Sequence, residues 1–174
     1  SEVYGTAKYT PIDEKHPMQG QSPYSATKIS ADYLSMSYFY SYSLPISIIR
    51  PFNTFGPRQS NRAVIPSIIL QIANNKKFIN LGLTTPKRDL SYIDDTVNGF
   101  VKTLGKNNIY GEIINIGQNY EISIYNLYKL ISNLMGKKIP LKKEIKRIRP
   151  KNSEVLRLKC NNSKARSLLN WRPK

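Results

Sequence analysis

Hydrophobic positions along the chain form short runs rich in Ile and Leu that alternate with longer segments of helical spacing. This alternation is typical of an α/β fold. The clearest helix start is Ser22 followed by Pro23, a side-chain cap and a proline at the first helical position. We expect this helix to continue to about Tyr42 and to have one apolar face. That face is predicted to consist of Ile29, Tyr33, Met36 and Tyr40.

The other elements are predicted from the same patterns. The segment 8–21 is rich in Pro, Gly and polar residues and indicates a loop. The segment 1–5 is predicted to end a strand, and further strands are predicted over 46–50, 78–81, 90–93 and 112–116. Helices are predicted over 64–75, 94–104, from a cap at Ser123 to Gly136, and over 162–169.

The charge balance is strongly basic. Lys and Arg number 27 against 11 Asp and Glu, a net charge of +16, and the cations crowd the segment 137–151. Such a charge can reflect a solvated surface, a site for a diphosphate, or a nucleic-acid surface. No nucleic-acid-binding motif accompanies the charge, and aromatic residues are not interleaved with it. We therefore expect no nucleic-acid partner.

Cysteine, histidine and hydropathy exclude several classes. A single cysteine, Cys160, cannot form an internal disulfide and fits a reducing, cytoplasmic compartment. A single histidine, His16, excludes a multi-histidine metal site, and we expect no metal. No apolar run approaches the roughly 18–20 residues that span a bilayer. The 174 residues are enough for a domain with a core.

A Tyr-x-x-x-Lys spacing occurs three times, and roughly one match is expected by chance, so context must choose among them. The matches are Tyr4/Lys8, Tyr24/Lys28 and Tyr125/Lys129. Tyr4 precedes Gly5 in a turn, and nothing near Tyr125 and Lys129 supplies an acid or base. Tyr24 and Lys28 lie in the first turns of a capped helix, where both side chains share a face. A nearby ammonium and a helix N-terminus favour a phenolate, which can take a proton from a sugar hydroxyl. The alternative is an ordinary surface pair.

Six motifs in order along nearly the whole chain are similar to those of the extended short-chain dehydrogenases/reductases. They are SEVYG (1–5), SPYSATK (22–28), RPFNTFGPR (50–58), RDLSYIDD (88–95), INIG (114–117) and an ending, NSKA…LLNWRP (162–173). The resemblance identifies the chain as a member of the NAD-dependent epimerase/dehydratase family. It implies a Rossmann-like parallel sheet, of which this would be the C-terminal part, and a smaller α/β substrate-binding lobe.

The residue at position 2 favours one branch of the family. Nucleotide-sugar 4,6-dehydratases resemble this chain in having Glu there, whereas 4-epimerases typically have Thr or another small residue. The resemblance makes Tyr24 the base for the 4-hydroxyl and makes Lys28 the ligand of the nicotinamide ribose. Glu2 would remove the C5 proton after oxidation at C4, water would leave from C6, and hydride would return to C6.

The residue before this glutamate departs from many deoxysugar dehydratases, which have an acidic Asp there. Ser1 is more like the dehydratases of GDP-mannose or of N-acetylhexosamine nucleotides, and the whole motif set is most like the legionaminic-acid type. Ser1 remains a candidate catalytic residue. Because a serine is a poor proton donor, we expect Glu2 to serve both proton transfers. Without the resemblance, Glu2 could be a solvated carboxylate.

Further site residues are expected from the resemblance. Pro51, with Tyr24 and Lys28, would contact NAD. Asn53 follows a predicted strand, at the strand end where open α/β sheets bind ligands. The predicted substrate-binding residues are Asn53, Arg58, Arg88 and Arg149, of which the arginines suit bidentate phosphate contacts. Each arginine taken alone could equally be a surface residue.

The Gly-x-x-Gly-x-x-Gly turn that seats the cofactor pyrophosphate in this family is absent from these 174 residues. We therefore expect residues 1–60 to be the C-terminal part of an incomplete NAD-binding domain, and 61–174 to be a substrate-binding lobe from which 94–117 returns to the sheet. The isolated chain should bind NAD poorly and turn over little. A UDP- or GDP-linked sugar is the expected substrate, and a homodimer the expected full-length assembly. A 4-epimerase and a non-catalytic sugar-nucleotide-binding module remain alternatives.

Overall fold

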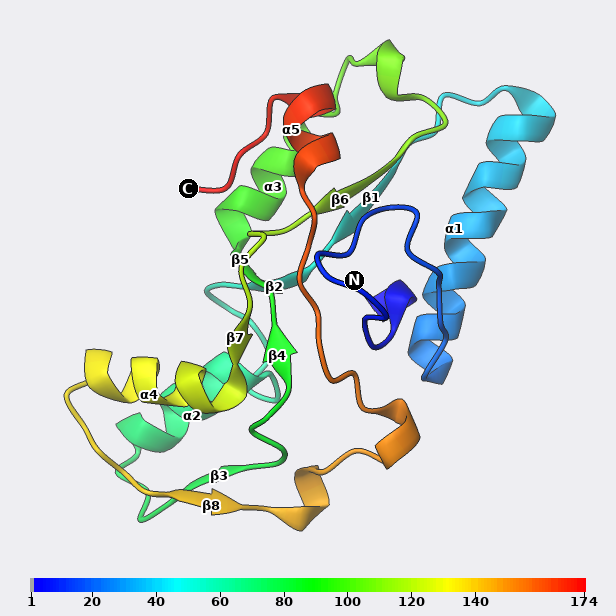
Figure 1. Cartoon of the computed structure of the whole chain (residues 1–174). Helices are drawn as coiled ribbons and strands as arrows, with labels where there is room; N and C mark the ends of the chain where they lie inside the picture. Colours follow the sequence, from blue (N-terminus) through cyan, green and yellow to red (C-terminus); the bar gives the residue numbers. More distant parts are fainter. Residues whose placement is uncertain (1) are drawn as a thin grey trace.

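The computed structural model describes residues 2–174 as two parts stacked end to end (Figure 1). The upper part holds the N-terminal helix and the C-terminal helix, and the lower part is a lobe of two helices over a strand pair. The strands of the described residues form four two-stranded sheets, and three of the four are parallel. The predicted α/β class with parallel strand pairing is confirmed.

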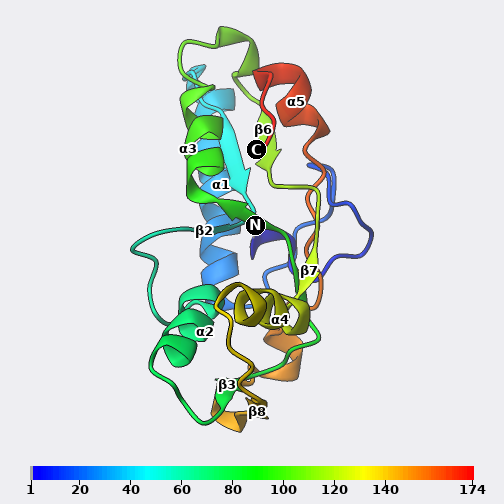
Figure 2. The same cartoon turned by 90° about the vertical axis from the view of Figure 1, so that its left-hand side faces the viewer.

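The upper part is built on β1 (Ile48–Pro51) and β6 (Ile113–Ile116), which pair in parallel with Arg50 opposite Asn115. This pair lies between α1 (Pro23–Tyr42) and α3 (Ile93–Val101), as both views show (Figures 1 and 2). The last helix, α5 (Ser163–Leu169), contacts β6. Gly99 of α3 permits close packing, because a Cβ there would overlap the Ile116 side chain.

The middle of the molecule carries two short strand pairs. The strand β2 (Asn53–Phe55) continues from β1 and pairs in parallel with β5 (Leu90–Tyr92). The strand β4 (Lys87–Arg88) pairs antiparallel with β7 (Ile122–Ser123). Both pairs lie at the junction of the two parts (Figure 1).

The lobe packs α2 (Val64–Ala73) and α4 (Ile124–Leu134) against the parallel strands β3 (Ile79–Leu81) and β8 (Leu141–Lys143). The side chain of Ser123 caps α4 by accepting a hydrogen bond from the Asn126 backbone N–H. The lobe core is wholly aliphatic. Its buried members are Ile68, Ile72, Ile79, Leu81, Ile124, Leu127 and Ile131.

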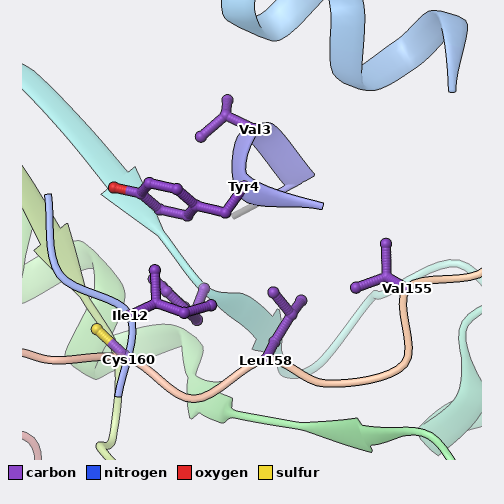
Figure 3. Close-up of a cluster of buried hydrophobic side chains, with 7 residues drawn as sticks. Val3, Tyr4, Ile12, Val155, Leu158 and Cys160 are labelled. Carbon is purple, nitrogen blue, oxygen red and sulfur yellow. The ribbon is translucent and has the colours of Figure 1, made fainter. Parts of the chain in front are cut away.

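A second core lies beneath the N-terminal segment and packs that segment against residues 155–160 (Figure 3). It joins the two ends of the chain, since Ile12 forms a parallel bridge with Cys160. The buried members are Val3, Tyr4, Ile12, Phe52, Val155, Leu158 and Cys160. A third core, around Trp171, packs α5 on β6.

Most predicted elements form within a few residues of the expected bounds, but the strand end predicted over 1–5 is wrong. Residues Glu2–Tyr4 form a 3₁₀ turn, η1, which closes when the Gly5 N–H donates to the Glu2 carbonyl at 3.3 Å. Gly5 has φ +61°, a left-handed conformation that turns the chain away from a strand path. The short strands β2, β4, β7 and β8 and further 3₁₀ turns at 107–109, 145–147 and 151–153 have no counterpart among the predictions.

The predicted apolar face of α1 is only partly correct. Met36 is buried, but the side chains of Tyr33 and Tyr40 are 64% and 74% exposed. The inward face instead includes two polar residues, Ser25 and Asp32, which bond with Ser22 and Arg50. Because satisfied polar groups occupy that face, hydrophobic spacing does not mark it. No helix within 2–174 has the length and apolar character needed to cross a membrane.

Candidate active site

Two cavities meet at the junction of the upper part and the lobe, and they share Glu2, Asn53 and Thr54 as a common wall. The first, of about 550 Å³, contains Tyr24 and Lys28 and is here named the reaction cavity. The second, of about 490 Å³, opens toward the lobe and is here named the arginine cavity. The arginines that line it are Arg62, Arg88, Arg147 and Arg149.

Tyr24 and Lys28 project from the first turns of α1 into the reaction cavity. A reciprocal capping box fixes the helix start: Ser22 Oγ accepts from the Ser25 N–H at 3.1 Å, and Ser25 Oγ accepts from the Ser22 N–H at 3.0 Å. The Lys28 ammonium lies 5.5 Å from the centroid of the Tyr24 ring. The ammonium and the phenol therefore share one face, as the helical spacing predicts.

Glu2 lines the same cavity from the 3₁₀ turn η1, near the start of the sequence. The two residues that follow it, Val3 and Tyr4, are 2% and 0% exposed and anchor the turn in the core shown in Figure 3. The structure thus brings Glu2 of η1 to the same cavity as Tyr24 and Lys28 of α1. Pro51 lines this cavity as well.

A buried polar network forms the floor of the reaction cavity, centred on Arg50 of β1, which is 4% exposed. Its Nε donates to Asp32 Oδ2 of α1 at 2.8 Å, and its Nη1 donates to the Tyr4 hydroxyl at 2.8 Å. Tyr4 in turn donates to Asn115 Oδ1 at 2.7 Å. Burial raises the pKa of Tyr4 to about 12, so this hydroxyl stays neutral and acts as a relay of hydrogen bonds.

The arginine cavity has one ordered cation. Arg88 Nη2 lies 3.1 Å from Glu154 Oε1, and both side chains are nearly covered, 13% and 11% exposed. Burial lowers the pKa of Arg88 from its ordinary value, and the neighbouring Glu154 and Glu2 oppose that shift. An arginine remains charged at neutral pH, so this position holds a fixed positive charge beside Glu2.

Three further cations of the arginine cavity lie on turns. Arg147 donates to Ser67 Oγ at 3.2 Å and pairs with Glu144, while Arg149 is exposed at the cavity edge. Arg62 lines the opposite wall at the start of α2. Arg62 and Arg147 are absent from the sequence-based predictions, because a lone arginine carries no local signal and only the fold places these two beside Arg88.

Asn53 lies where the two cavities meet, as the first residue of β2. Its Oδ1 is buried, and among residues 2–174 it has no hydrogen-bond partner. A buried amide oxygen without a partner is uncommon and marks a position where a ligand group can donate. Ser91 Oγ is a second such atom, one strand away on β5.

Two predicted site residues are not placed in either cavity by the described residues. The structure places Arg58 on an exposed turn, with φ +65°, and it lines neither cavity. Ser1 lies outside the described residues. Within 2–174, no three His, Cys, Asp or Glu side chains gather where they could hold a metal ion. His16 is instead buried and bonded to the backbone of Lys8 and Pro17.

The comparison with family models decides the relationship. A model described as GDP-mannose 4,6 dehydratase matches residues 1–174. The chain belongs to this family of NAD-dependent epimerases and dehydratases. Among its family relatives, human dTDP-D-glucose 4,6-dehydratase is 31% identical over 176 residues, a match that covers 99% of this chain and 50% of the relative.

Solved structures of the family superpose on the whole chain. The dTDP-glucose 4,6-dehydratase of Bacillus anthracis, solved in complex with NAD, matches with a TM-score of 0.90 at 29% identity, covering 99% of this chain and 54% of that structure. The UDP-glucuronic acid 4-epimerase of Bacillus cereus, solved with UDP-glucuronic acid and NAD, matches with a TM-score of 0.90 at 32% identity, covering 100% of this chain and 54% of that one. The chain spans about half the length of these family members, which include both dehydratases and epimerases.

Proposed function

We propose that this chain carries the catalytic and substrate-binding part of an NAD-dependent nucleotide-sugar 4,6-dehydratase. The observation that carries the proposal is the convergence of Glu2, Tyr24 and Lys28 on one cavity that adjoins an arginine-lined cavity. The carboxylate of η1 has no structural need to meet the phenol and ammonium of α1 there, whereas a sugar that is oxidised and dehydrated needs all three.

The reaction cavity fits the nicotinamide riboside portion of NAD, the cofactor with which similar enzymes were solved. Lys28 offers an ammonium to ribose hydroxyls, Tyr24 a phenol, and Pro51 an apolar surface that can face a ring. NAD, when bound, accepts hydride from C4 of the sugar and returns it to C6. The remaining steps belong to side chains of this chain.

Tyr24 takes the proton of the 4-hydroxyl while the C4 hydrogen leaves as hydride. The resulting ketone makes the adjacent C5 proton acidic, and Glu2 removes it. The C6 hydroxyl then departs as water and receives its proton from the same carboxyl group, which balances the elimination. When hydride returns to C6, C5 takes up a proton from solvent, which completes the 4-keto-6-deoxy product. The position of Glu2 on the wall between the cavities lets it face the far end of a sugar whose C4 lies beside Tyr24.

The diphosphate of the substrate is assigned to the arginine cavity. Arg88 is held in place by Glu154, and Arg149 together with Arg62 and Arg147 adds positive charge around it. Guanidinium groups bind phosphate oxygens through paired N–H donors. The unpartnered Asn53 Oδ1 accepts from a sugar hydroxyl between the two cavities. Arg58, a candidate from the sequence, lines neither cavity and is left out of this assignment.

A 4-epimerase is the second candidate, favoured by the equally good superposition on the Bacillus cereus epimerase. Both reactions begin with oxidation at C4, so they differ in whether Glu2 removes the C5 proton. Within the dehydratase proposal, the motif set favours a UDP- or GDP-linked N-acetylhexosamine of the legionaminic-acid type. That substrate would place the enzyme in cell-surface polysaccharide synthesis in the cytoplasm.

The test uses the natural polypeptide in which these residues occur, incubated with NAD and with UDP-N-acetylglucosamine, GDP-mannose and dTDP-glucose in separate reactions. The product is read by mass spectrometry. We expect a nucleotide sugar that has lost one water and carries a 4-ketone. An epimer of unchanged mass would instead support the epimerase, and no conversion of any of the three would contradict both.

We further propose that the 174 residues alone bind NAD weakly and do not turn over, because their sequence has no Gly-rich pyrophosphate turn. Titration of this polypeptide with a UDP- or GDP-sugar in the absence of NAD examines the binding-module alternative, which predicts saturable binding without turnover.

We also propose a homodimer for the full-length protein. The exposed residues Tyr33, Leu34, Tyr38 and Tyr40 on α1 offer it an apolar surface.

A further inference from the structure

Asp32 lies one helical turn beyond Lys28 on α1, a spacing at which an acid and a lysine are ion-pair neighbours. The structure pairs Asp32 with another partner, Arg50, at 2.8 Å. None of the ion pairs among residues 2–174 includes Lys28, whose ammonium lies by the Tyr24 ring. Lys28, Asp32 and Arg50 all line the reaction cavity.

The competition between Arg50 and Lys28 for Asp32 is uneven. Arg50 is 4% exposed and Asp32 18% exposed, so their attraction is weakly screened by water. Arg50 is also held from its other side, because its Nη1 donates to the Tyr4 hydroxyl and its Nη2 contacts Met18 Sδ at 3.2 Å. Lys28 is exposed, and an exposed helical pair is a weak interaction. Arg50 therefore keeps the carboxylate.

We propose that Arg50 is a positioning residue that holds Asp32 away from Lys28, and thereby keeps the Lys28 ammonium directed at Tyr24. Without Arg50, the Asp32 carboxylate is free and Lys28 becomes its nearest cation on the helix. The ammonium then turns away from Tyr24, and its positive charge is neutralised by the new partner. The catalytic consequence rests on the proposed function, whereas the change of ion-pair partner does not.

The charged and titratable groups that face Tyr24 and Lys28 are few enough to be controlled. From the segments around the reaction cavity they are Glu2, Asp32 and Arg50, with Tyr4 behind Arg50. When Arg50 is replaced, Tyr4 loses a hydrogen bond, and Asp32 is the carboxylate that loses its ion-pair partner. Arg50→Gln and Asp32→Asn break the same ion pair, but only the first leaves a free carboxylate beside Lys28. This difference separates the proposal from a purely structural role of the pair.

The first test is structural and needs no activity. Crystal structures of the natural polypeptide in which these residues occur are determined for Arg50→Gln, Asp32→Asn and the double variant. We expect Lys28 Nζ to move to ion-pair distance from Asp32 in Arg50→Gln only, and to remain beside Tyr24 in the other two. Lys28 beside Tyr24 in Arg50→Gln would overturn the proposal and leave the proposed function untouched.

The second test is kinetic. Arg50→Gln should lower kcat/KM by about tenfold to a hundredfold, because the Lys28 ammonium no longer lies beside Tyr24. Asp32→Asn should lose less than about threefold, and the double variant should return to within about threefold of Asp32→Asn. Equal losses in both single variants, with no recovery in the double variant, would overturn the proposal.

A conservative variant covers the case in which Arg50→Gln does not fold. Arg50→Lys keeps a cation beside Asp32 but lacks the planar fork that also bonds Tyr4. We expect it to retain kcat/KM to within about threefold of the unaltered protein, with Lys28 still beside Tyr24. A loss of kcat/KM as large as that of Arg50→Gln, with Asp32 still paired to the introduced ammonium, would contradict the proposal. Absence of any turnover in the unaltered protein would refute the proposed function, while the crystal structures would still decide the ion-pair partner.

Discussion

The core beneath the reaction cavity and the core of the lobe are built from different kinds of side chain. The first combines apolar residues with the buried network of Arg50, Tyr4 and Asn115. In the second, the buried apolar side chains are all isoleucine or leucine, and its buried polar side chains, Ser67 and Ser132, carry no charge. Hydrogen bonds have fixed lengths and directions, but apolar packing does not. The comparison teaches that the upper part fixes reactive groups in place, while the lobe supplies stability and leaves its arginines on turns.

The largest effect should come from the reactive group that the upper part positions. Tyr24→Phe removes the proton acceptor and should lower kcat by about 10²- to 10⁴-fold with little change in substrate affinity. Tyr33→Phe is the matched control, since Tyr33 is an exposed tyrosine on the same helix, and it should retain full turnover. Steady-state kinetics of the two variants measure the difference. A kcat loss below about tenfold for Tyr24→Phe would remove the phenol from the proposed chemistry.

The lobe core should respond in stability. Ile72→Ala deletes a side chain that is 0% exposed in an all-aliphatic cluster, so it should lower the free energy of unfolding by about 2–5 kcal/mol. Urea denaturation followed by circular dichroism measures this. Ile69→Ala, on the same helix but 40% exposed, should cost less than about 1 kcal/mol. Similar losses for the two variants would mean that the lobe core is not packed as described.

Substrate affinity should depend on the arginine cavity. Arg88→Ala removes the ordered cation and should raise the substrate dissociation constant by about 10- to 100-fold, as expected for lost charge-assisted hydrogen bonds. The dissociation constant of Arg88→Lys should lie between those of the unaltered protein and Arg88→Ala, because lysine keeps the charge and loses the bidentate fork. Arg58→Ala, on an exposed turn outside both cavities, should bind normally in calorimetric titration. Weakened binding in Arg58→Ala equal to that of Arg88→Ala would contradict the assignment of the diphosphate.

The smallest effect should come from the surface ion pair between Arg157 and Glu121, the residue just before β7. A hydrogen bond from Arg157, together with the charges of Arg157 and Lys87, lowers the pKa of Glu121 below its ordinary 4.5. Glu121 therefore contributes stability above about pH 4.5 and loses it as pH falls through the lowered value in the folded state. Glu121→Gln should lower the melting temperature slightly at neutral pH and should match the unaltered protein once the pH lies below the lowered pKa of Glu121. A difference that grows toward low pH would reverse this sign.

The sequence predicted the helices well because their signals are local. Ser22 and Pro23 marked the start of α1, Ser123 marked the start of α4, and Gly136 lies just beyond its end. The side chains of Ser22 and Ser123 accept the capping hydrogen bonds that stabilise these helix starts. The strand end predicted for 1–5 was wrong because Gly5 adopts a left-handed turn. The exposure of Tyr33 and Tyr40 was missed because Ser25 and Asp32 occupy the inner face of α1 through bonds that no hydrophobic pattern encodes.

The candidate site likewise contains residues that local motifs predicted and residues that only the fold brings together. Glu2, Tyr24 and Lys28 were chosen by motif, and the fold brings them to one cavity, although their catalytic roles remain predictions. Arg62 and Arg147 could not have been found, since their place beside Arg88 depends on long-range packing of the lobe. The same holds for Arg50, whose link between Tyr4 and Asp32 joins positions 46 and 18 residues away along the chain.

The most direct test of the account follows proton removal at C5. The natural polypeptide in which these residues occur is incubated in D₂O with NAD and its nucleotide sugar, and C5 deuteration and cofactor reduction are followed together. We predict deuterium at C5 with the unaltered protein, cofactor reduction without C5 deuterium in Glu2→Gln, and neither signal in Tyr24→Phe. Deuterium at C5 in Glu2→Gln at the unaltered rate would contradict the convergence of these groups on one sugar ring.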